Sequence, residues 1–188
     1  ESQNSLAGRV MLRDTWSFAA RWPRKENEIE MNKTPHICIL TSQYFGWGIY
    51  GGFGSMSRKL AESLAEAGYK VSVILPRRSD QKPIEIINRV EVRSFPALNI
   101  VEALRLIRNS DADIFHSQDP TILTYFAQKL HPKCIHLVTC RDPRDAKDWW
   151  IEFFHATGKR RLFIPFNYLT ESSYLVKRAV RKADGVYC

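Results

Sequence analysis

Short apolar runs alternate with helix-like segments along most of this chain. Residues 36–41 (HICILT) and 70–75 (KVSVIL) are apolar with little alternation, which is typical of strands buried on both faces of a sheet. Between them, apolar residues recur at helical spacing from 53 to 64, and Gly68 suits the end of a helix. Pro76 is expected to end the second strand. These positions predict a strand–helix–strand unit.

The same alternation continues through the rest of the chain. Asn99 and Glu102 have the spacing of a capping box, and Asp119 with Pro120 suits the N-cap and first turn of a helix. The pattern predicts further strands at 90–96, 113–117, 134–139 and 185–188, and helices at 101–107, 120–130 and 174–183. Strands alternating with helices predict an α/β fold with a Rossmann-like, doubly wound and mostly parallel sheet.

The beginning of the chain does not share this pattern. Residues 1–34 show no clean period and mix charges with isolated aromatic residues. We expect them to form an N-terminal extension, either a flexible or partly docked arm or a vector-derived segment. Residues 35–188 are then one domain, and a hydrophobic fraction of 44% is enough for its core.

The charge of the chain is basic and unevenly distributed. Lys and Arg number 28 against 20 Asp and Glu, which gives a formal net charge of +8, and half of the excess lies in residues 143–188. A solvated basic face accounts for it, as does affinity for an anionic substrate, an anionic membrane surface or a nucleic acid. Since no nucleic-acid-binding motif is present, we expect no nucleic-acid partner.

The cysteines and the hydropathy bear on disulfides, metal sites and the compartment of the protein. Cys38, Cys134, Cys140 and Cys188 lie in or beside short apolar runs and form no CxxC motif, which favours free thiols over disulfides. The histidines show no metal-ligand spacing with them, so no metal site is expected. No apolar run reaches about 18 residues and no signal segment is visible, which predicts a soluble, cytoplasmic protein.

A glycine-rich segment follows the first predicted strand. Residues 46–51 (GWGIYG) match the pattern GxGxxG, but residues 43–45 separate them from the strand, whereas the dinucleotide-binding motif begins within a residue or two of it. Gly51 and Gly52, directly before the predicted helix, would let backbone N–H groups approach a phosphate closely. A plain turn is the alternative.

Two further observations bear on the nucleotide. Arg77 and Arg78 end the second predicted strand, where arginine would favour the 2′-phosphate of NADP. Surface charge explains them equally simply. An NADP-binding oxidoreductase domain is therefore one alternative function, although it leaves the later strand ends unexplained.

Polar residues gather after two later strands. His116 and Asp119 lie at the end of one, and Arg141 and Asp142 follow the next. Because ligands of doubly wound sheets bind outside the carboxyl ends of the strands, these residues predict a cleft lining. Each has a structural alternative: a half-buried core position for His116, a helix cap for Asp119, and an ion pair between Arg141 and Asp142.

The order of these blocks resembles the N-terminal half of the retaining GT-B glycosyltransferases (glycosyl transferase group 1, family 4-like). The resemblance covers residues 36–188. It rests on residues 50–76 (YGGFGSMSRKLAESLAEAGYKVSVILP), 111–120 (DADIFHSQDP), 138–142 (VTCRD) and 182–188 (KADGVYC). It implies that the parent enzyme transfers a sugar from a nucleotide-sugar donor to a sugar, glycan or lipid-linked acceptor, with retention of the anomeric configuration. No further cofactor and no metal are implied.

The resemblance also implies roles for particular residues. Gly51 and Gly52 match a glycine pair that approaches the donor diphosphate, while His116, Asp119, Arg141 and Asp142 match substrate-binding blocks. Arg141 stands where many members carry a histidine, and an arginine can bind phosphate or carboxylate but cannot act as a base at neutral pH. The donor-binding C-terminal domain with its Glu-x7-Glu motif is absent, so we expect this fragment alone to be inactive.

Two alternatives remain open. A non-catalytic sugar- or nucleotide-binding module would have the same architecture. Aromatic residues at 149–154, followed by the basic residues 159–161, either pack under a basic surface or form a patch for peripheral membrane contact.

Overall fold

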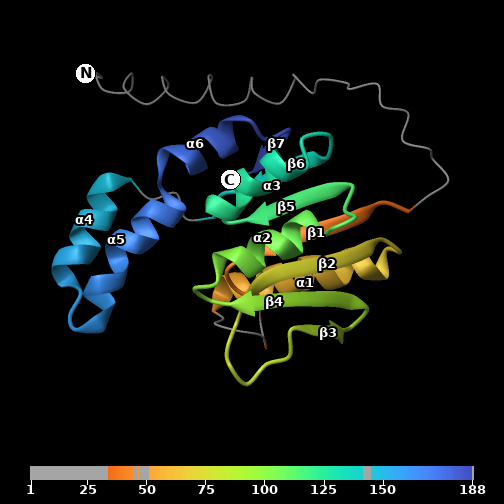
Figure 1. Cartoon of the computed structure of the whole chain (residues 1–188), viewed down its shortest axis with the longest axis horizontal. Coiled ribbons are helices and arrows are strands. Elements are labelled where there is room, and N and C mark those ends of the chain that lie inside the picture. The colour runs from red at the N-terminus through yellow and green to blue at the C-terminus, as the bar shows by residue number, and fades with distance from the viewer. Residues whose placement is uncertain (1–33, 45, 47–50, 142–144, 188) are drawn as a thin grey trace, which may run out of the picture.

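The structure, a computed structural model, describes residues 34–44, 46, 51–141 and 145–187 (Figure 1). The strands are β1 (His36–Thr41), β2 (Lys70–Arg77), β3 (Ile84–Ile87), β4 (Val90–Pro96), β5 (Ile114–Gln118), β6 (Ile135–Thr139) and β7 (Gly185–Tyr187). The helices are α1 (Gly52–Glu66), α2 (Ile100–Arg108), α3 (Ile122–Leu130), α4 (Ala146–His155), α5 (Lys159–Glu171) and α6 (Tyr174–Arg181). The extension expected at 1–34 falls almost entirely outside the described residues.

The described strands form one seven-stranded sheet in the order β3-β4-β2-β1-β5-β6-β7. Every neighbouring pair is parallel except β3 and β4, which are antiparallel. The predicted doubly wound α/β fold is therefore confirmed. The chain leaves β1 toward β2 and later returns to the other side of β1 with β5, so the strand order reverses between β1 and β5.

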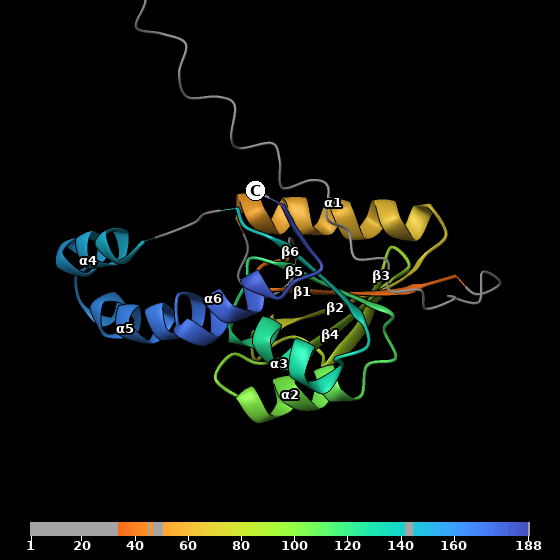
Figure 2. The ribbon, with the colours of Figure 1, turned by 90° about the horizontal axis from the view of Figure 1, so that it is seen from above.

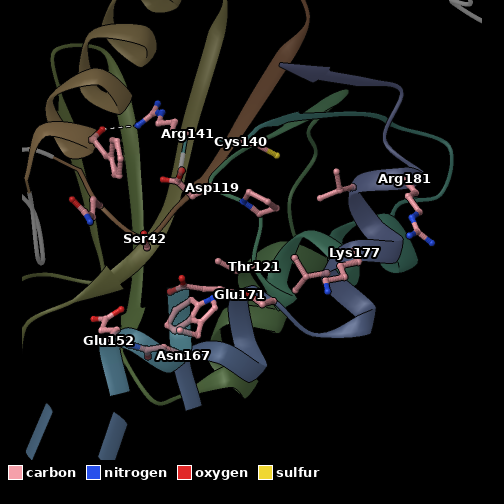
Figure 3. Close-up of a pocket in the computed structure, with 17 residues that line it drawn as sticks. Ser42, Asp119, Thr121, Cys140, Arg141, Glu152, Asn167, Glu171, Lys177 and Arg181 are labelled. Carbon is pink, nitrogen blue, oxygen red and sulfur yellow. Dashed lines mark hydrogen bonds between the residues drawn. The ribbon is translucent and has the colours of Figure 1, made fainter. Parts of the chain in front are cut away.

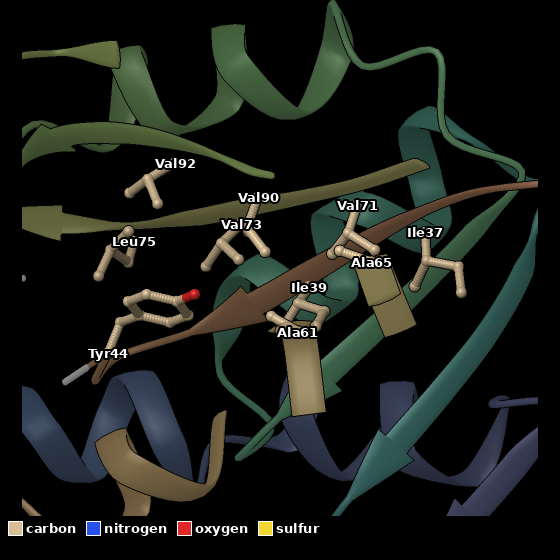
Figure 4. Packing of buried hydrophobic residues seen from close by; sticks show 10 residues of the cluster. All are labelled: Ile37, Ile39, Tyr44, Ala61, Ala65, Val71, Val73, Leu75, Val90 and Val92. Atoms are coloured by element: carbon tan, nitrogen blue, oxygen red, sulfur yellow. The ribbon is translucent and has the colours of Figure 1, made fainter. Parts of the chain in front are cut away.

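Helices cover both faces of the sheet, as Figure 2 shows, with α1 on one face and α2 and α3 on the other. Alternate residues of β1 face opposite layers because strand side chains have a period of two. Ile37 and Ile39 pack with Ala61 and Ala65 of α1 (Figure 4), whereas Cys38 belongs to the core under α2 and α3. This two-sided burial explains the unbroken apolar run in the sequence.

The α1 helix begins at Gly52, after the N-cap Gly51, and ends before Gly68, whose φ of +92° is the left-handed conformation that glycine adopts easily. Its predicted span is confirmed. The buried positions of α1 are small residues, Gly54, Ser57, Ala61 and Ala65, which bring the helix axis close to the sheet.

Two features of the β2–β4 region differ from the prediction. The β2 strand continues through Pro76 to Arg77, because pairing with β1 stops at Ile74 and the missing N–H of Pro76 therefore leaves no gap on that side. The β3 strand was not predicted. It forms a hairpin with β4 through Asn88 and Arg89, both at positive φ, without the glycine that usually marks such a turn.

The helices α4 and α5 were not predicted either, and they project from the sheet as a hairpin (Figures 1 and 2). We call residues 146–171 the α4–α5 arm. Asp145 caps α4 in a capping box with Asp148. A small core of Trp149, Ala156 and Ile164 holds the two helices together.

Candidate functional site

A cavity of about 800 Å³ lies outside the carboxyl ends of β1, β5 and β6 (Figure 3). This is the point where the strand order reverses, the usual place for ligands in a doubly wound sheet. Its walls come from these strand ends, the first turn of α1, the α4–α5 arm and α6. The lining residues are Ser42, Gln43, Phe53, Asp119, Pro120, Thr121, Cys140, Arg141, Trp149, Glu152, Asn167, Glu171, Ser172, Val176, Lys177, Val180 and Arg181.

Asp119 lines the cavity immediately after β5, in an unusual backbone conformation. Its φ is +74°, in the left-handed region that Asp and Asn tolerate better than most residues. Its backbone N–H donates to the carbonyl oxygen of Thr139 at 3.0 Å, which fixes the end of β5 against the end of β6. The cavity and this conformation place the Asp119 carboxyl group beside Arg141 (Figure 3).

The helix cap that the sequence assigned to Asp119 belongs to Thr121 instead. Thr121 Oγ1 accepts a hydrogen bond from the N–H of Leu123 at 3.2 Å, and Thr124 Oγ1 accepts one from the N–H of Thr121 at 3.1 Å. The prediction was wrong because the left-handed φ of Asp119 turns the chain two residues before the helix begins. Helix capping therefore does not explain Asp119.

Arg141 crosses from the end of β6 to the first turn of α1. Its Nη1 donates to the carbonyl oxygen of Phe53 at 2.8 Å and to Ser57 Oγ at 3.2 Å, and the guanidinium lies 5.8 Å from the centre of the Phe53 ring. Its Nε is buried and has no hydrogen-bond partner. Burial lowers the pKa of Arg141, opposed by the charge of Asp119, and the group stays cationic.

His116 lies in β5 below the cavity and is not among the residues that line it. Its Nε2 is 2.9 Å from Thr139 Oγ1 and 2.8 Å from Gln118 Nε2, so the ring joins β5 to β6. Burial, followed by the nearby charge of Arg141, lowers the pKa of His116 to about 4. The imidazole is therefore neutral at neutral pH.

The two glycines occupy the start of α1, as predicted, beside the cavity rather than in its lining. Gly51 is the N-cap, and a Cβ built there would lie 3.2 Å from Gln43 Oε1. A Cβ built at Gly52 would meet nothing within 4 Å. The first turn carries no acidic residue and its N-cap makes no side-chain hydrogen bond, so no negative charge within the turn offsets the positive end of the helix dipole. Asp142 lies outside the described residues.

Sequence reasoning missed the cavity walls that come from the arm and from α6. Glu152, Asn167 and Glu171 line the cavity from the α4–α5 arm, and Lys177 and Arg181 line it from α6. These residues follow no strand end. A signal existed only in the helical spacing of residues 174–183, which predicts a helix but not the side it turns to the cavity.

The arginines that suggested NADP have other contacts. Arg77 donates to the carbonyl oxygen of Ser94 on β4, and Arg78 pairs with Asp80 at 3.1 Å. Both are thus explained as structural and surface charges, one of the two explanations that the sequence allowed.

Three of the four cysteines lie in the described part of the chain. Cys38, Cys134 and Cys140 are free thiols, as predicted. In that part, no cluster of three or more His, Cys, Asp or Glu residues is suited to hold a metal ion. Its helices include none with the length and apolar character needed to cross a membrane.

Comparisons with solved structures give weak likenesses. The catalytic domain of starch synthase IV from Arabidopsis thaliana bound to ADP and acarbose aligns with a TM-score of 0.45 and 13% identity, over 58% of this chain and 34% of that one. An alpha-glucosyltransferase in complex with UDP and a 13-mer DNA containing a HMU base aligns with a TM-score of 0.42 and 16% identity, over 82% and 37%. A DNA/pantothenate metabolism flavoprotein from Streptococcus pneumoniae gives 0.40 and 12%, over 70% and 76%.

This chain thus spans about a third of the length of the two transferases it was compared with. None of the curated proteins matches it significantly. The model of one protein family, Glycosyltransferase Family 4, matches residues 50–188. That match covers the helix α1, the ends of β5 and β6 at the cavity, the α4–α5 arm and α6. Because the matched segment makes up most of the sequence, the chain belongs to Glycosyltransferase Family 4.

Proposed function

We propose that this chain is the acceptor-side domain of an enzyme that transfers a sugar from a nucleotide-sugar donor to an acceptor, with retention of the anomeric configuration. The observation that carries the proposal is the cavity at the carboxyl ends of β1, β5 and β6, with Asp119 and Arg141 in its wall. In this proposal a C-terminal domain, absent from this sequence, holds the donor and closes over the cavity.

The chemistry proposed for this domain is positioning and charge stabilisation. Departure of a nucleoside diphosphate builds negative charge on the leaving oxygen, and fixed donors aimed at that charge lower the barrier. The open N-terminus of α1 at Gly51 and Gly52 supplies backbone N–H groups for the diphosphate. Arg141 supplies a permanent positive charge on the same side of the cavity.

We assign no general acid or base among these residues. His116 is neutral, partly buried and bonded within the sheet, so we assign it a positioning role beneath Thr139 and Gln118. Asp119 faces the cavity and is suited to accept hydrogen bonds from acceptor hydroxyl groups. Asp142, which lies outside the described residues, completes the proposed substrate-binding set. Nothing in this scheme requires a metal or a further cofactor.

The experiment that tests the proposal uses the complete protein, translated from the coding region beyond Cys188. Release of nucleoside diphosphate is measured from UDP-, GDP- and ADP-sugars with and without glycan or lipid-linked acceptors, and the anomeric configuration of any product is read by NMR. We expect acceptor-dependent release with one donor class and a retained configuration. Inversion would contradict retention, and no acceptor-dependent release from any donor would contradict the transferase.

A matched pair of variants connects the activity to this site. Gly51→Val places a branched side chain against Gln43 at the start of α1, and transfer is expected to fall by two orders of magnitude, about 100-fold, by loss of close approach. Leu98→Ser, an exposed substitution before α2, is the control. Near-normal transfer by Gly51→Val would remove the glycine pair from the donor site.

A further inference from the structure

The α4–α5 arm exposes an unusual amount of apolar surface. On α5, Leu162 is 78% exposed, Phe166 49% and Leu169 62%. Their spacing of four and three residues places them on one stripe of the helix. The buried side of α5, formed by Ile164 and the half-buried Tyr168, lies on the other side of the same helix. The helix is therefore apolar on both sides, and only one side has a protein partner among the described residues.

The α4 helix of the same arm exposes aromatic residues as well. Trp150 is 63% exposed, and its ring stacks on Phe153 at 6.1 Å and meets Phe154 edge-on at 4.9 Å. Tryptophan and phenylalanine clusters of this kind are typical of the boundary between water and lipid, where an apolar ring and a polar edge are both accommodated. Large exposed apolar patches otherwise rarely persist on soluble proteins.

Positive charge accompanies the apolar surface. Residues 146–182 contain eight Lys and Arg against three Asp and Glu. The Arg161 guanidinium lies 4.6 Å from the centre of the Phe153 ring, so a cation sits directly on the aromatic cluster. Lys177 and Arg181 of α6 are exposed as well, but they line the cavity, so the charge that accompanies the outer side of the arm is that of Arg161. Aromatic and aliphatic anchors combined with basic residues are complementary to a bilayer that carries anionic headgroups.

The α4–α5 arm also borders the cavity. Trp149, Glu152 and Asn167, on the inner side of the same two helices, line the cavity. Both views show the arm standing away from the sheet, so its outer side is accessible to a flat surface (Figures 1 and 2). A bilayer in contact with the outer side would lie one helix thickness from the cavity.

We propose that the outer face of the α4–α5 arm, formed by Trp150, Phe154, Leu162, Phe166 and Leu169, docks on an anionic lipid bilayer, and that the acceptor entering the adjoining cavity is anchored in that bilayer. The docking is independent of the transferase reaction, whereas the acceptor class rests on the proposed function. The two parts are tested separately.

The docking is measured by co-sedimentation of the 188-residue chain and of the complete protein with vesicles. Vesicles of phosphatidylcholine mixed with phosphatidylglycerol are compared with vesicles of phosphatidylcholine alone. We expect binding to the mixed vesicles that weakens with added salt. The double substitution Leu162→Ser and Leu169→Ser is expected to weaken binding by about tenfold or more, because each leucine loses its transfer into the lipid boundary.

The control replaces Leu98 and Val101 by Ser, two equally exposed aliphatic residues outside the arm. The control is expected to bind vesicles like the unaltered chain, and circular dichroism checks that both doubles are folded. Equal loss in both doubles, or no binding to either vesicle, would overturn the docking. So would self-association in sedimentation velocity without lipid that the arm double abolishes, or binding by the 188-residue chain but not by the complete protein.

The acceptor class is tested by transfer kinetics with the complete protein. The same glycan acceptor is offered free and attached to a lipid in the mixed vesicles. We expect the arm double to raise KM for the lipid-attached acceptor and to leave kcat/KM for the free acceptor unchanged. Equal effects on both acceptors would overturn the acceptor class while leaving the transferase intact. Absence of all transfer would instead contradict the proposed function, whatever the vesicles show.

Discussion

Arg141 Nη1 donates a hydrogen bond of 2.8 Å to the carbonyl oxygen of Phe53, a residue 88 positions earlier in the chain. One side chain thus joins the loop after β6 to the first turn of α1, across the carboxyl ends of the strands between them. The same guanidinium contacts Ser57 and the Phe53 ring. The α1 N-terminus that we propose for phosphate binding is therefore held in place by a residue that itself lines the cavity.

Replacing Arg141 by Met keeps most of the side-chain volume and removes these donors. We expect the free energy of unfolding, measured by urea denaturation, to fall by about 1.5–3 kcal/mol, as for other hydrogen bonds made by a charged group. Hydrogen exchange should rise first in the opening turn of α1. Arg141→Lys keeps the charge and one donor and should lose less. Arg108→Met, on the exposed end of α2, is the control, and an equal loss there would remove the special role of Arg141.

Thr121, rather than Asp119, is expected to stabilise the start of α3. Thr121→Ala removes the hydroxyl that accepts from Leu123 and should lower the free energy of unfolding by about 1 kcal/mol. Thr121→Ser retains the oxygen and should keep most of the stability. Urea denaturation of the three proteins measures the difference. An unchanged stability in Thr121→Ala would return the cap to Asp119.

The continuous patterns in the sequence were sufficient for the parallel strands but not for the antiparallel edge strand β3. The β1 strand and the α1 helix were predictable because burial on both faces of a strand and on one face of a helix leaves clear patterns. The β3 strand was not, since it is short, exposed at Ile84 and Ile86, and joined to β4 by a turn without glycine. The helices α4 and α5 were not predictable because α5 carries apolar residues on two sides, which obscures the helical period of its sequence.

The site was predictable in position and less so in detail. Strand ends pointed to the carboxyl edge of the sheet, and the cavity lies there. The segment Asp119-Pro120-Thr121 offers two residues suited to cap a helix, and only the positive φ of Asp119 decides between them. Contacts such as that of Arg141 with Phe53 join distant segments and leave no local pattern.

The lowered pKa of His116 makes the stability of the domain depend on pH. Because the pKa is about 4 in the folded protein against an ordinary 6.5, the unfolded chain takes up the proton first as the pH falls. The stability that depends on neutral His116 is fully present above pH 6.5. It is lost as the pH falls toward 4, which lowers the free energy of unfolding by at most about 3 kcal/mol. His116→Gln cannot be protonated and should lose less stability between pH 7 and pH 4.5.

The comparison with the variant is needed because the pKa of His36 is also lowered, chiefly by burial. His36 contributes to the pH dependence of both proteins, so the difference between their urea denaturation curves isolates His116. An identical pH dependence in both proteins would show that His116 is protonated as readily in the fold as in water, which would contradict its buried, neutral state.

A substitution at Gly52 is expected to affect the stability of the fold and the proposed donor site in opposite directions. A Cβ built there meets nothing within 4 Å, and the residue opens α1, so Gly52→Ala should raise the free energy of unfolding by about 0.5–1 kcal/mol. The same methyl group would occupy space that we propose for the donor diphosphate, and transfer by the complete protein should fall. Denaturation and nucleotide release, measured on the same preparation, check the two effects. Ala67→Gly, at the other end of α1, serves as the converse control, with lower stability and unchanged transfer per folded molecule. If Gly52→Ala is more stable and equally active, the start of α1 is an ordinary turn, and the phosphate must bind elsewhere.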